Sequence, residues 1–217
     1  MLTPFKDRDD MSQRYRRTGS FGYDAAVRSK TELRDEILAA ARTEFAQHGL
    51  AGSRIDRITA AAHASKERLY AHFGDKETLF RGVVAADGRQ YFANFRMRPD
   101  AVAEFVGDVY DLARSHPEHL RMLTWARLEG LTIEPPALDD EAPPDQALAT
   151  IEAAQAAGYV DPSWSPTDLL VLLFGVGLAW AQFPDPQPAT ADDPAVVASR
   201  RAAAVEAAAR IISPTGH

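Results

Sequence analysis

The stretch that decides the fold reads "SKERLYAHFGDKETLF" and covers residues 65–80. Ser65 is a residue type that caps helix N-termini, and it is followed by a short helical segment. Leu69 and Phe73 are four residues apart, so both lie on one face of that segment, and charged residues occupy the other faces. Gly74 ends the segment before the next one begins. The pattern predicts two helices joined by a tight turn.

The residues around this stretch extend the pattern. Asp75 is expected to cap the following helix. Upstream, Ser53 is expected to cap a short helix that carries Ile55 and Ile58. Apolar residues recur every fourth position between residues 31 and 49, which is typical of an amphipathic helix. Two short helices joined by a turn, with a third packed before them, form a helix-turn-helix, an arrangement that places its last helix in the DNA major groove.

Charge is distributed unevenly along the 217 residues, whose net charge is −7. A negative total taken alone argues against nucleic-acid binding. However, residues 1–82 hold 15 Lys and Arg against 12 Asp and Glu, whereas residues 83–217 hold 9 against 19. This asymmetry predicts a module that faces nucleic acid, attached to an acidic body.

The rest of the chain predicts helices only, with no strand-like alternation of useful length, so the expected fold class is all-α. The apolar run at residues 169–181 is shorter than the roughly 18 residues that a membrane span needs, and it is expected to form a fully buried helix. The chain contains no cysteine, and its N-terminus has no apolar leader segment. We therefore expect a cytoplasmic protein without membrane association.

On the residues quoted above, the sequence resembles the tetracycline-repressor (TetR) family of bacterial transcription regulators. The resemblance covers residues 31–80 and is most specific in the core Leu-Tyr-x-His-Phe-x-x-Lys-x-x-Leu, residues 69–79. It implies a helix-turn-helix DNA-binding domain over 30–76 and a helical ligand-sensing and dimerisation domain over 77–217. It also implies a homodimer on a palindromic double-stranded DNA operator, a small-molecule effector, and no cofactor. Residues 1–29 are polar, basic and interrupted by glycine, so they are expected to form a flexible arm.

The resemblance also assigns the DNA-binding residues by position. Tyr70, His72 and Lys76 are expected to contact phosphates, while Lys66, Glu67 and Arg68 face the bases. Ser65 caps a helix N-terminus whose free N–H groups suit a phosphate. The complete predicted DNA-binding set is Arg54, Ser65, Lys66, Glu67, Arg68, Tyr70, His72 and Lys76.

Two residues depart from the family pattern. The family favours glycine where His63 stands, because the turn residue has a positive φ angle there, and we expect a slightly strained or reshaped turn. The family also favours a small residue at Glu67. Its carboxylate either accepts a hydrogen bond from cytosine in the major groove or lies toward solvent and pairs with a neighbouring cation.

The N-terminal arm leaves two hypotheses open. Its cations either contact DNA or belong to a merely solvated tail; they are Arg14, Arg16, Arg17, Arg28 and Lys30. Met11 is kept as a hypothesis for the native start.

The C-terminal part gives fewer signals. Aromatic residues at helical spacing are individually more typical of a core, but together they match an apolar effector site, for which we select Phe105, Trp125, Glu129 and Phe174. The helices expected at 166–183 and 193–212 are assigned to dimerisation. His116 and His119 have no obvious third ligand, so no metal site is expected, and no nucleophile motif indicates an enzyme. The alternative function is a constitutive DNA-binding protein without an effector.

Overall fold

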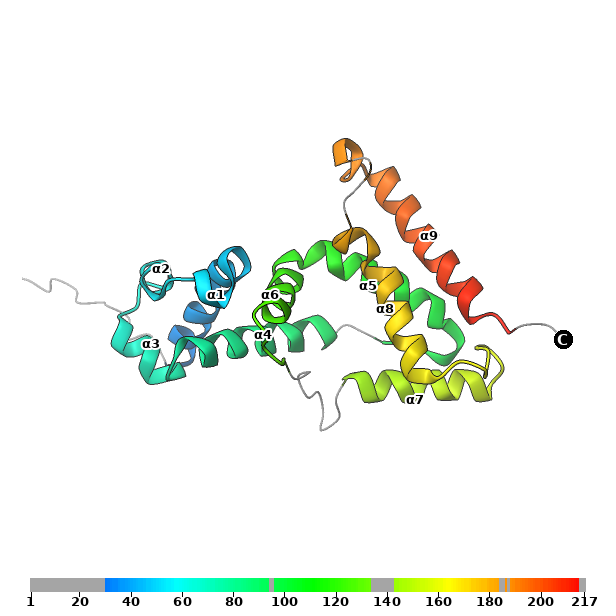
Figure 1. Ribbon diagram of the computed structural model, residues 1–217, viewed down its shortest axis with the longest axis horizontal. Helices are drawn as coiled ribbons and strands as arrows, with labels where there is room; N and C mark the ends of the chain where they lie inside the picture. Colours follow the sequence, from blue (N-terminus) through cyan, green and yellow to red (C-terminus); the bar gives the residue numbers. More distant parts are fainter. Residues whose placement is uncertain (1–29, 94–95, 134–142, 184–185, 187, 215–217) are drawn as a thin grey trace, which may run out of the picture.

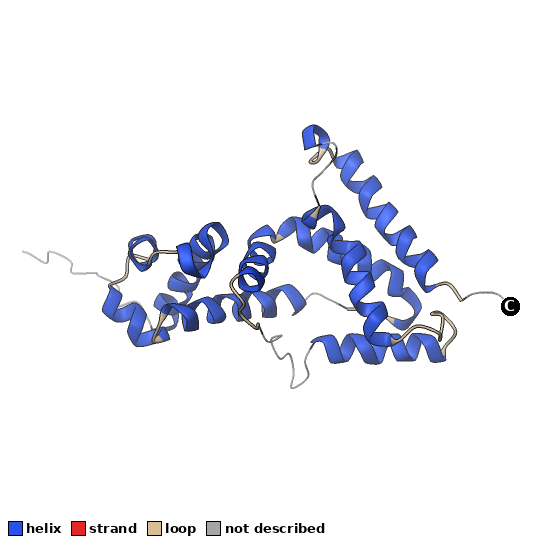
Figure 2. Cartoon of the chain, in the orientation of Figure 1, coloured by secondary structure: helices blue, strands red, loops and turns tan. Residues whose placement is uncertain are grey.

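The computed structural model describes residues 30–93, 96–133, 143–183, 186 and 188–214. The predictions for residues 1–29 of the arm and for Met11 lie outside these residues, whereas Lys30 is the exposed first residue of the first helix. Within the described ranges every regular element is a helix, as Figure 2 shows, so the prediction of an all-α fold is confirmed. In the same ranges no helix combines the length and the apolar character needed to cross a membrane.

The helices form two groups, a head and a body (Figure 1). The head contains four helices in chain order: α1 (Lys30–Gly52), α2 (Ile55–Ala61), α3 (Lys66–Phe73) and α4 (Lys76–Ala93). The other elements are the short 3₁₀ helices η1 (Pro99–Ala101) and η2 (Pro188–Thr190), and α5 (Val102–Ser115), α6 (Pro117–Leu128), α7 (Pro143–Ala156), α8 (Pro166–Gln182) and α9 (Pro194–Ile212). Proline stands at the first position of several helices, where its missing N–H costs no hydrogen bond.

Two apolar clusters hold the molecule together. The first contains the inner faces of α1 to α4 and extends past residue 76 to Leu79, Phe80 and Val84 of α4. Met122 and Ala126 of α6 are also buried in it. The second cluster is built from α5, α7, α8 and α9. The helix α6 therefore packs with the head, although the chain reaches it directly from the body helix α5.

The start of α2 differs from the sequence prediction. The expectation that Ser53 caps this helix is wrong, because Ser53 is buried and its hydroxyl donates to the Leu50 carbonyl oxygen at 2.8 Å. Arg54 occupies the N-cap position without a side-chain cap of its own. Its backbone N–H donates instead to the carboxylate of Glu44 on α1, at 2.8 Å. A contact between two helices thus replaces the local cap.

The helix α8 also differs from its prediction. It is capped by Ser165, but it is not fully buried as expected. Leu169, Leu170 and Leu173 are buried, whereas Val171 and Leu172 are 65% and 44% exposed. The helix is apolar all round, yet only one side has a partner within the described chain.

The side of α8 that is covered lies close to α5. A Cβ atom added at Gly177 would come within 2.6 Å of Val109 Cγ1, so glycine allows the two helices to approach. On another side of α5, Arg201 of α9 lies across Gly107 and forms ion pairs with Glu104, Asp108 and Asp111, of which the pair with Asp111 is the shortest at 2.8 Å. These contacts fix α5 between α8 and α9.

Candidate DNA-binding site and effector domain

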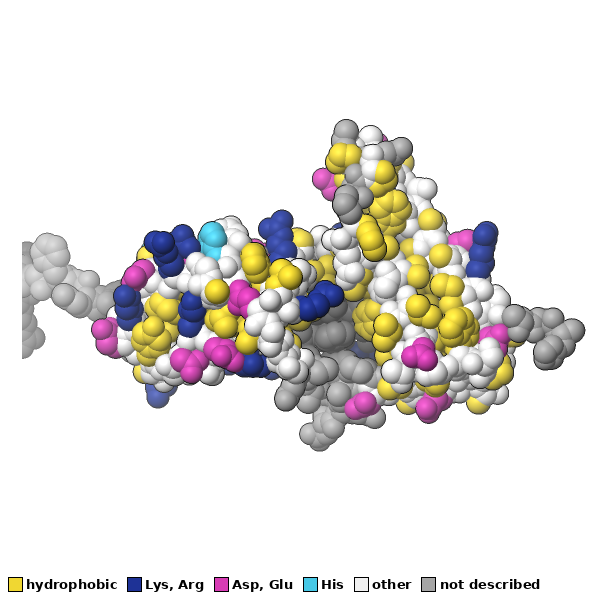
Figure 3. All heavy atoms as spheres, in the orientation of Figure 1, with side chains coloured by type: hydrophobic (Ala, Val, Ile, Leu, Met, Phe, Trp, Pro, Cys, Tyr) yellow, Lys and Arg dark blue, Asp and Glu magenta, His cyan; other side chains and the backbone are white. Residues whose placement is uncertain are grey.

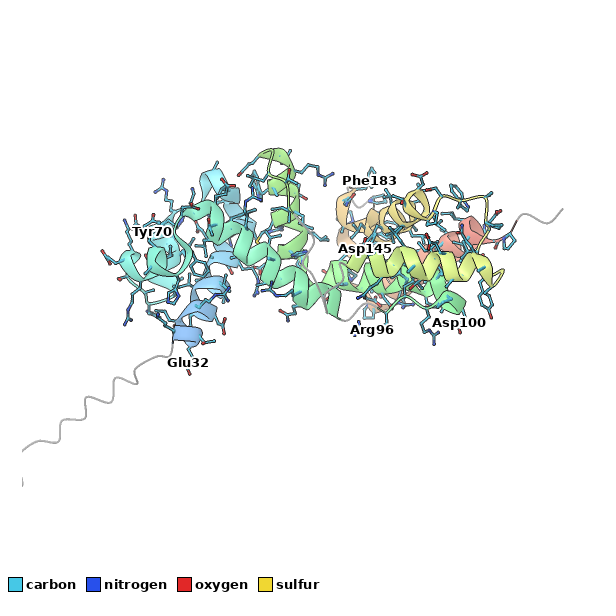
Figure 4. The ribbon with its side chains drawn as sticks, turned by 90° about the horizontal axis from the view of Figure 1, so that it is seen from below. Glu32, Tyr70, Arg96, Asp100, Asp145 and Phe183 are labelled. Atoms are coloured by element: carbon cyan, nitrogen blue, oxygen red, sulfur yellow. The ribbon has the colours of Figure 1, made fainter. Side chains whose placement is uncertain are left out.

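The helix α3 presents a charged face at the outer part of the head. Leu69 and Phe73 are buried against the first cluster, as predicted. Lys66, Glu67 and Arg68 are exposed. Figure 3 shows many Lys and Arg side chains on the head. Tyr70 is 43% exposed, and Figure 4 shows it on the head, at the opposite end of the molecule from Phe183 on the body. The head therefore offers a solvent-facing helix with cations, an acid and a phenol.

Local signals around α3 form as the sequence predicts. Ser65 is the N-cap residue, and its hydroxyl accepts a hydrogen bond from the Arg68 N–H at 3.3 Å. Gly74 ends the helix at a φ angle of 77°, and the Asp75 carboxylate accepts from the Thr78 N–H at 2.7 Å at the start of α4. His63, in the turn before α3, has a φ angle of 48°, which is costly for a residue with a Cβ atom. The predicted strained turn is present.

Glu67 has a role in the free protein that neither sequence hypothesis contained. The pKa of Glu67 is lowered below its ordinary value, first by its own backbone N–H and then by the Ser65 hydroxyl, which both favour the ionised carboxylate. An acid in the first turn also matches the positive end of the helix dipole. The negative charge thus helps the N-terminus of α3 to form, and base contact by Glu67 stays a prediction.

The neighbouring cation, Lys66, is paired with a different acid. Its ammonium group lies 2.6 Å from Asp56 Oδ1 on α2, and this hydrogen bond raises the pKa of Lys66. Both side chains are exposed, so the pair contributes little to stability. Sequence reasoning did not select Asp56. A signal for it was available, because an acid ten positions before Lys66 on the preceding short helix can reach across a tight turn.

Three other predicted DNA-binding residues have different surroundings. Arg54 is exposed at the start of α2. His72 is half-buried, and its ring centroid lies 6.1 Å from that of Phe73. The Lys76 ammonium donates to the carbonyl oxygens of Ala51 at 3.4 Å and Ser53 at 3.2 Å. An ammonium group carries three donor hydrogens, so these two bonds leave Lys76 one hydrogen for a phosphate.

Glu44 organises the α2 side of this surface and was also missed by the sequence prediction. The carboxylate is 8% exposed and, besides the Arg54 N–H, it accepts from Arg57 Nε at 2.9 Å. Arg57 is a half-exposed cation on α2 that this bond holds in place. Glu44 lies 10 positions before Arg54 and 13 before Arg57, on the preceding helix, so no short sequence motif connects these three residues.

Comparisons with known proteins agree with this geometry. Residues 37–83 match the family model described as bacterial regulatory proteins of the tetR family, and residues 101–210 match the tetracyclin repressor-like C-terminal domain. The chain belongs to the TetR family of transcriptional regulators. The HTH-type transcriptional repressor SCO4008 of Streptomyces coelicolor is 33% identical over 157 residues, which are 72% of this chain and 81% of that protein.

Other relatives give the same result. The HTH-type transcriptional regulator RutR of Escherichia coli K12 is 29% identical over 162 residues, 71% of this chain and 73% of that protein. The crystal structure of SCO4942 from Streptomyces coelicolor, described as a transcriptional regulator, superposes with a TM-score of 0.70 at 35% identity. The superposition covers 84% of this chain and 99% of the SCO4942 chain. The resemblance to the TetR family inferred from residues 31–80 is confirmed, and the family members named here are regulators of transcription.

The four residues predicted to bind an effector lie in two separate places in the structure. Phe105 of α5 and Phe174 of α8 lie together in the body, with ring centroids 5.3 Å apart and nearly perpendicular planes. Trp125 and Glu129 do not join them. The Trp125 indole N–H donates to the Ala46 carbonyl oxygen of α1 at 3.3 Å, and Glu129, which follows α6, accepts from the Ala51 N–H at the end of α1. Both residues face the head.

A further polar group in the body is Tyr110 of α5. Its side chain is 1% exposed, and its hydroxyl has no hydrogen-bond partner within the part of the chain that the structure describes. A buried hydroxyl without a partner costs about 1–3 kcal/mol. Tyr110 is therefore a better candidate for a polar contact to a ligand than Glu129, and its position four residues from Val106 on the buried face of α5 could have indicated it.

Proposed function

We propose that this TetR-family protein is a ligand-responsive repressor that binds a near-palindromic operator as a homodimer in the cytoplasm. The observation that carries the proposal is the exposed face of α3, where Lys66, Arg68 and Tyr70 point away from the buried Leu69 and Phe73. An exposed helix with cations and a phenol on its outer face supports the proposal that α3 is the recognition helix. Two such helices would enter successive major grooves about 34–36 Å apart.

Selection of bound fragments from genomic DNA tests the operator. We expect a near-palindromic site whose affinity falls steeply with salt, because several phosphates are neutralised by Lys and Arg side chains. Binding that depends on salt but shows no sequence preference would refute the repressor proposal. The HTH-type repressor SCO4008 supports the sign of regulation, since it is named a repressor.

The role of Glu67 is tested on the selected operator. If its carboxylate accepts from cytosine, Glu67→Gln changes the preferred base at one position in each half-site, and affinity for the original operator falls. The matched control is Glu77→Gln, which removes an exposed acid from the first turn of α4. Unchanged base preference in Glu67→Gln would leave Glu67 as a helix-stabilising acid only.

The dimer is supported by the uncovered side of α8. Val171 and Leu172 are exposed there, and Phe183 at the helix end is 72% exposed. Hydrophobic side chains cover much of the body in Figure 3. We expect light scattering to give twice the chain mass for the wild-type protein and one chain mass for Leu172→Glu. A monomeric wild-type protein that still binds the operator tightly would contradict the dimer.

The effector is supported by the buried hydroxyl of Tyr110 and by the Phe105 and Phe174 rings. A thermal-shift screen of small molecules, followed by operator-binding assays of each compound that stabilises the protein, tests it. A true effector stabilises the protein and weakens operator binding, because it prefers a conformation that does not fit the DNA. Failure of every stabilising compound to alter DNA binding would favour a constitutive DNA-binding protein.

A further inference from the structure

The end of α1 is held from two sides, by Glu129 just after α6 and by Lys76 of α4. From the α6 side, both carboxylate oxygens of Glu129 lie 3.2 Å from the backbone nitrogen of Ala51 and accept its hydrogen. From the α4 side, the Lys76 ammonium donates to the Ala51 carbonyl oxygen. The backbone of one residue is thus bound at its N–H and at its carbonyl. This residue lies three positions before Arg54, where the helix-turn-helix begins.

A second contact holds α1 just before its kink. Ala46 lies three residues before Gly49, where the backbone of α1 leaves helical geometry. The Trp125 indole N–H donates to the Ala46 carbonyl oxygen at 3.3 Å. The ring lies so close to Gly49 that an added Cβ atom would be 2.9 Å from Trp125 Cδ2 and 2.4 Å from Glu129 Oε1. Gly49, with a φ angle of 67°, is needed for both the turn and this contact.

These contacts connect the body to the DNA-binding surface by a short route. The helix α6 follows α5 after His116 alone, and Met122 and Ala126 bury it in the core of the head. A rotation of α6 about its axis would therefore move Trp125 and Glu129, and with them the end of α1. Because only two residues separate α1 from α2, a small displacement there would change the direction of α2 and α3.

We propose that Trp125 and Glu129 are positioning residues for operator binding, which set the orientation of α2 and α3 relative to the body. The inference rests on the proposed function, because orientation matters only when two heads of a dimer must match two half-sites. In that dimer the contact fixes the distance between the two recognition helices. Neither residue needs to touch DNA or effector.

The test is the preference of the protein for half-site spacing. Affinity is measured for the selected operator and for versions in which the centre is one base pair longer or shorter. The wild-type protein is expected to discriminate among the three. In Glu129→Ala we expect this discrimination to fall by about tenfold, which corresponds to one lost hydrogen bond to a charged group. The double variant Trp125→Phe, Glu129→Ala also loses the indole N–H and is expected to lose more of the discrimination.

Two matched variants separate positioning from stability. Glu129→Gln keeps an oxygen that accepts from the Ala51 N–H, so it is expected to retain most of the discrimination that Glu129→Ala loses. Arg127→Gln changes an exposed residue on the same helix and is expected to behave as the wild type. A variant that is merely less stable would bind all three operators more weakly by the same factor.

The outcomes are distinct. Loss of discrimination in Glu129→Ala and the double variant, with recovery in Glu129→Gln, supports the proposal. Equal discrimination in the wild type and the folded double variant, or an equal loss of affinity for all three operators, overturns it while leaving the repressor function intact. A wild-type protein with no sequence preference refutes the proposed function, and the positioning role falls with it.

Discussion

The substitution Gly177→Ala tests the close contact between α5 and α8 that organises the body. The new methyl group would lie 2.6 Å from Val109 Cγ1, 2.7 Å from Val109 Cβ and 3.1 Å from the Val106 carbonyl oxygen. The Cβ atom of a valine is attached directly to the helix backbone, and its branched side chain is stiff. The two helices must therefore separate, because no flexible side chain can move aside.

The magnitude follows from two opposing effects. Alanine is favoured over glycine inside a helix by about 1 kcal/mol. Overpacking of a tight contact costs about 1–3 kcal/mol. We expect Gly177→Ala to leave stability unchanged or lower it by up to about 2 kcal/mol. The control is Gly82→Ala on α4, where the nearest atom lies at 3.8 Å, an ordinary contact, so only the gain of about 1 kcal/mol remains.

Urea unfolding followed by circular dichroism measures both variants against the wild type. The protein concentration is kept constant, because the stability of a dimer depends on it. The reasoning requires Gly177→Ala to be less stable than Gly82→Ala by about 1–3 kcal/mol. If both substitutions stabilise the protein equally, α5 and α8 do not pack as closely as described.

Three further predictions concern charges. Glu44→Gln is expected to lower the free energy of unfolding by about 1–3 kcal/mol in urea titrations, whereas Glu36→Gln on the exposed side of the same helix changes it by less than about 0.5 kcal/mol. Burial lowers the pKa of His119 below 6.5, so the unfolded chain takes up a proton that the folded protein does not. Stability is therefore expected to fall as the pH drops below about 6.5, and His119→Gln should show a smaller fall in thermal unfolding scans; an identical fall would contradict this assignment. Asp56→Asn releases Lys66 from its ion pair and is expected to raise DNA affinity by less than about fivefold in fluorescence-anisotropy titrations, a gain that shrinks with salt. A loss of affinity would mean that the pair orients Lys66 for DNA.

Much of the local structure of the candidate DNA-binding site could be predicted from the sequence because its signals are local. The cap at Ser65, the end at Gly74, the buried pair Leu69 and Phe73, and the strained turn at His63 each depend on residues within one or two turns of each other. Capping and turn chemistry operate over such distances, so sequence spacing contains the required information. The pattern typical of the TetR family at residues 69–79 then indicated that the protein regulates transcription.

The tertiary structure alone decided which partners the longer-range residues have. Ser53 has the chemistry of a cap, yet Glu44 from the preceding helix satisfies the start of α2. Trp125 and Glu129 were predicted to lie in the effector site, yet they contact Ala46 and Ala51 of α1. Spacing along a helix determines which residues share a face, but the helix that covers this face depends on packing between segments distant in sequence. The sequence therefore determined α3 and its charged face, and only the packing of α6 against α1 determined how the head is attached to the body.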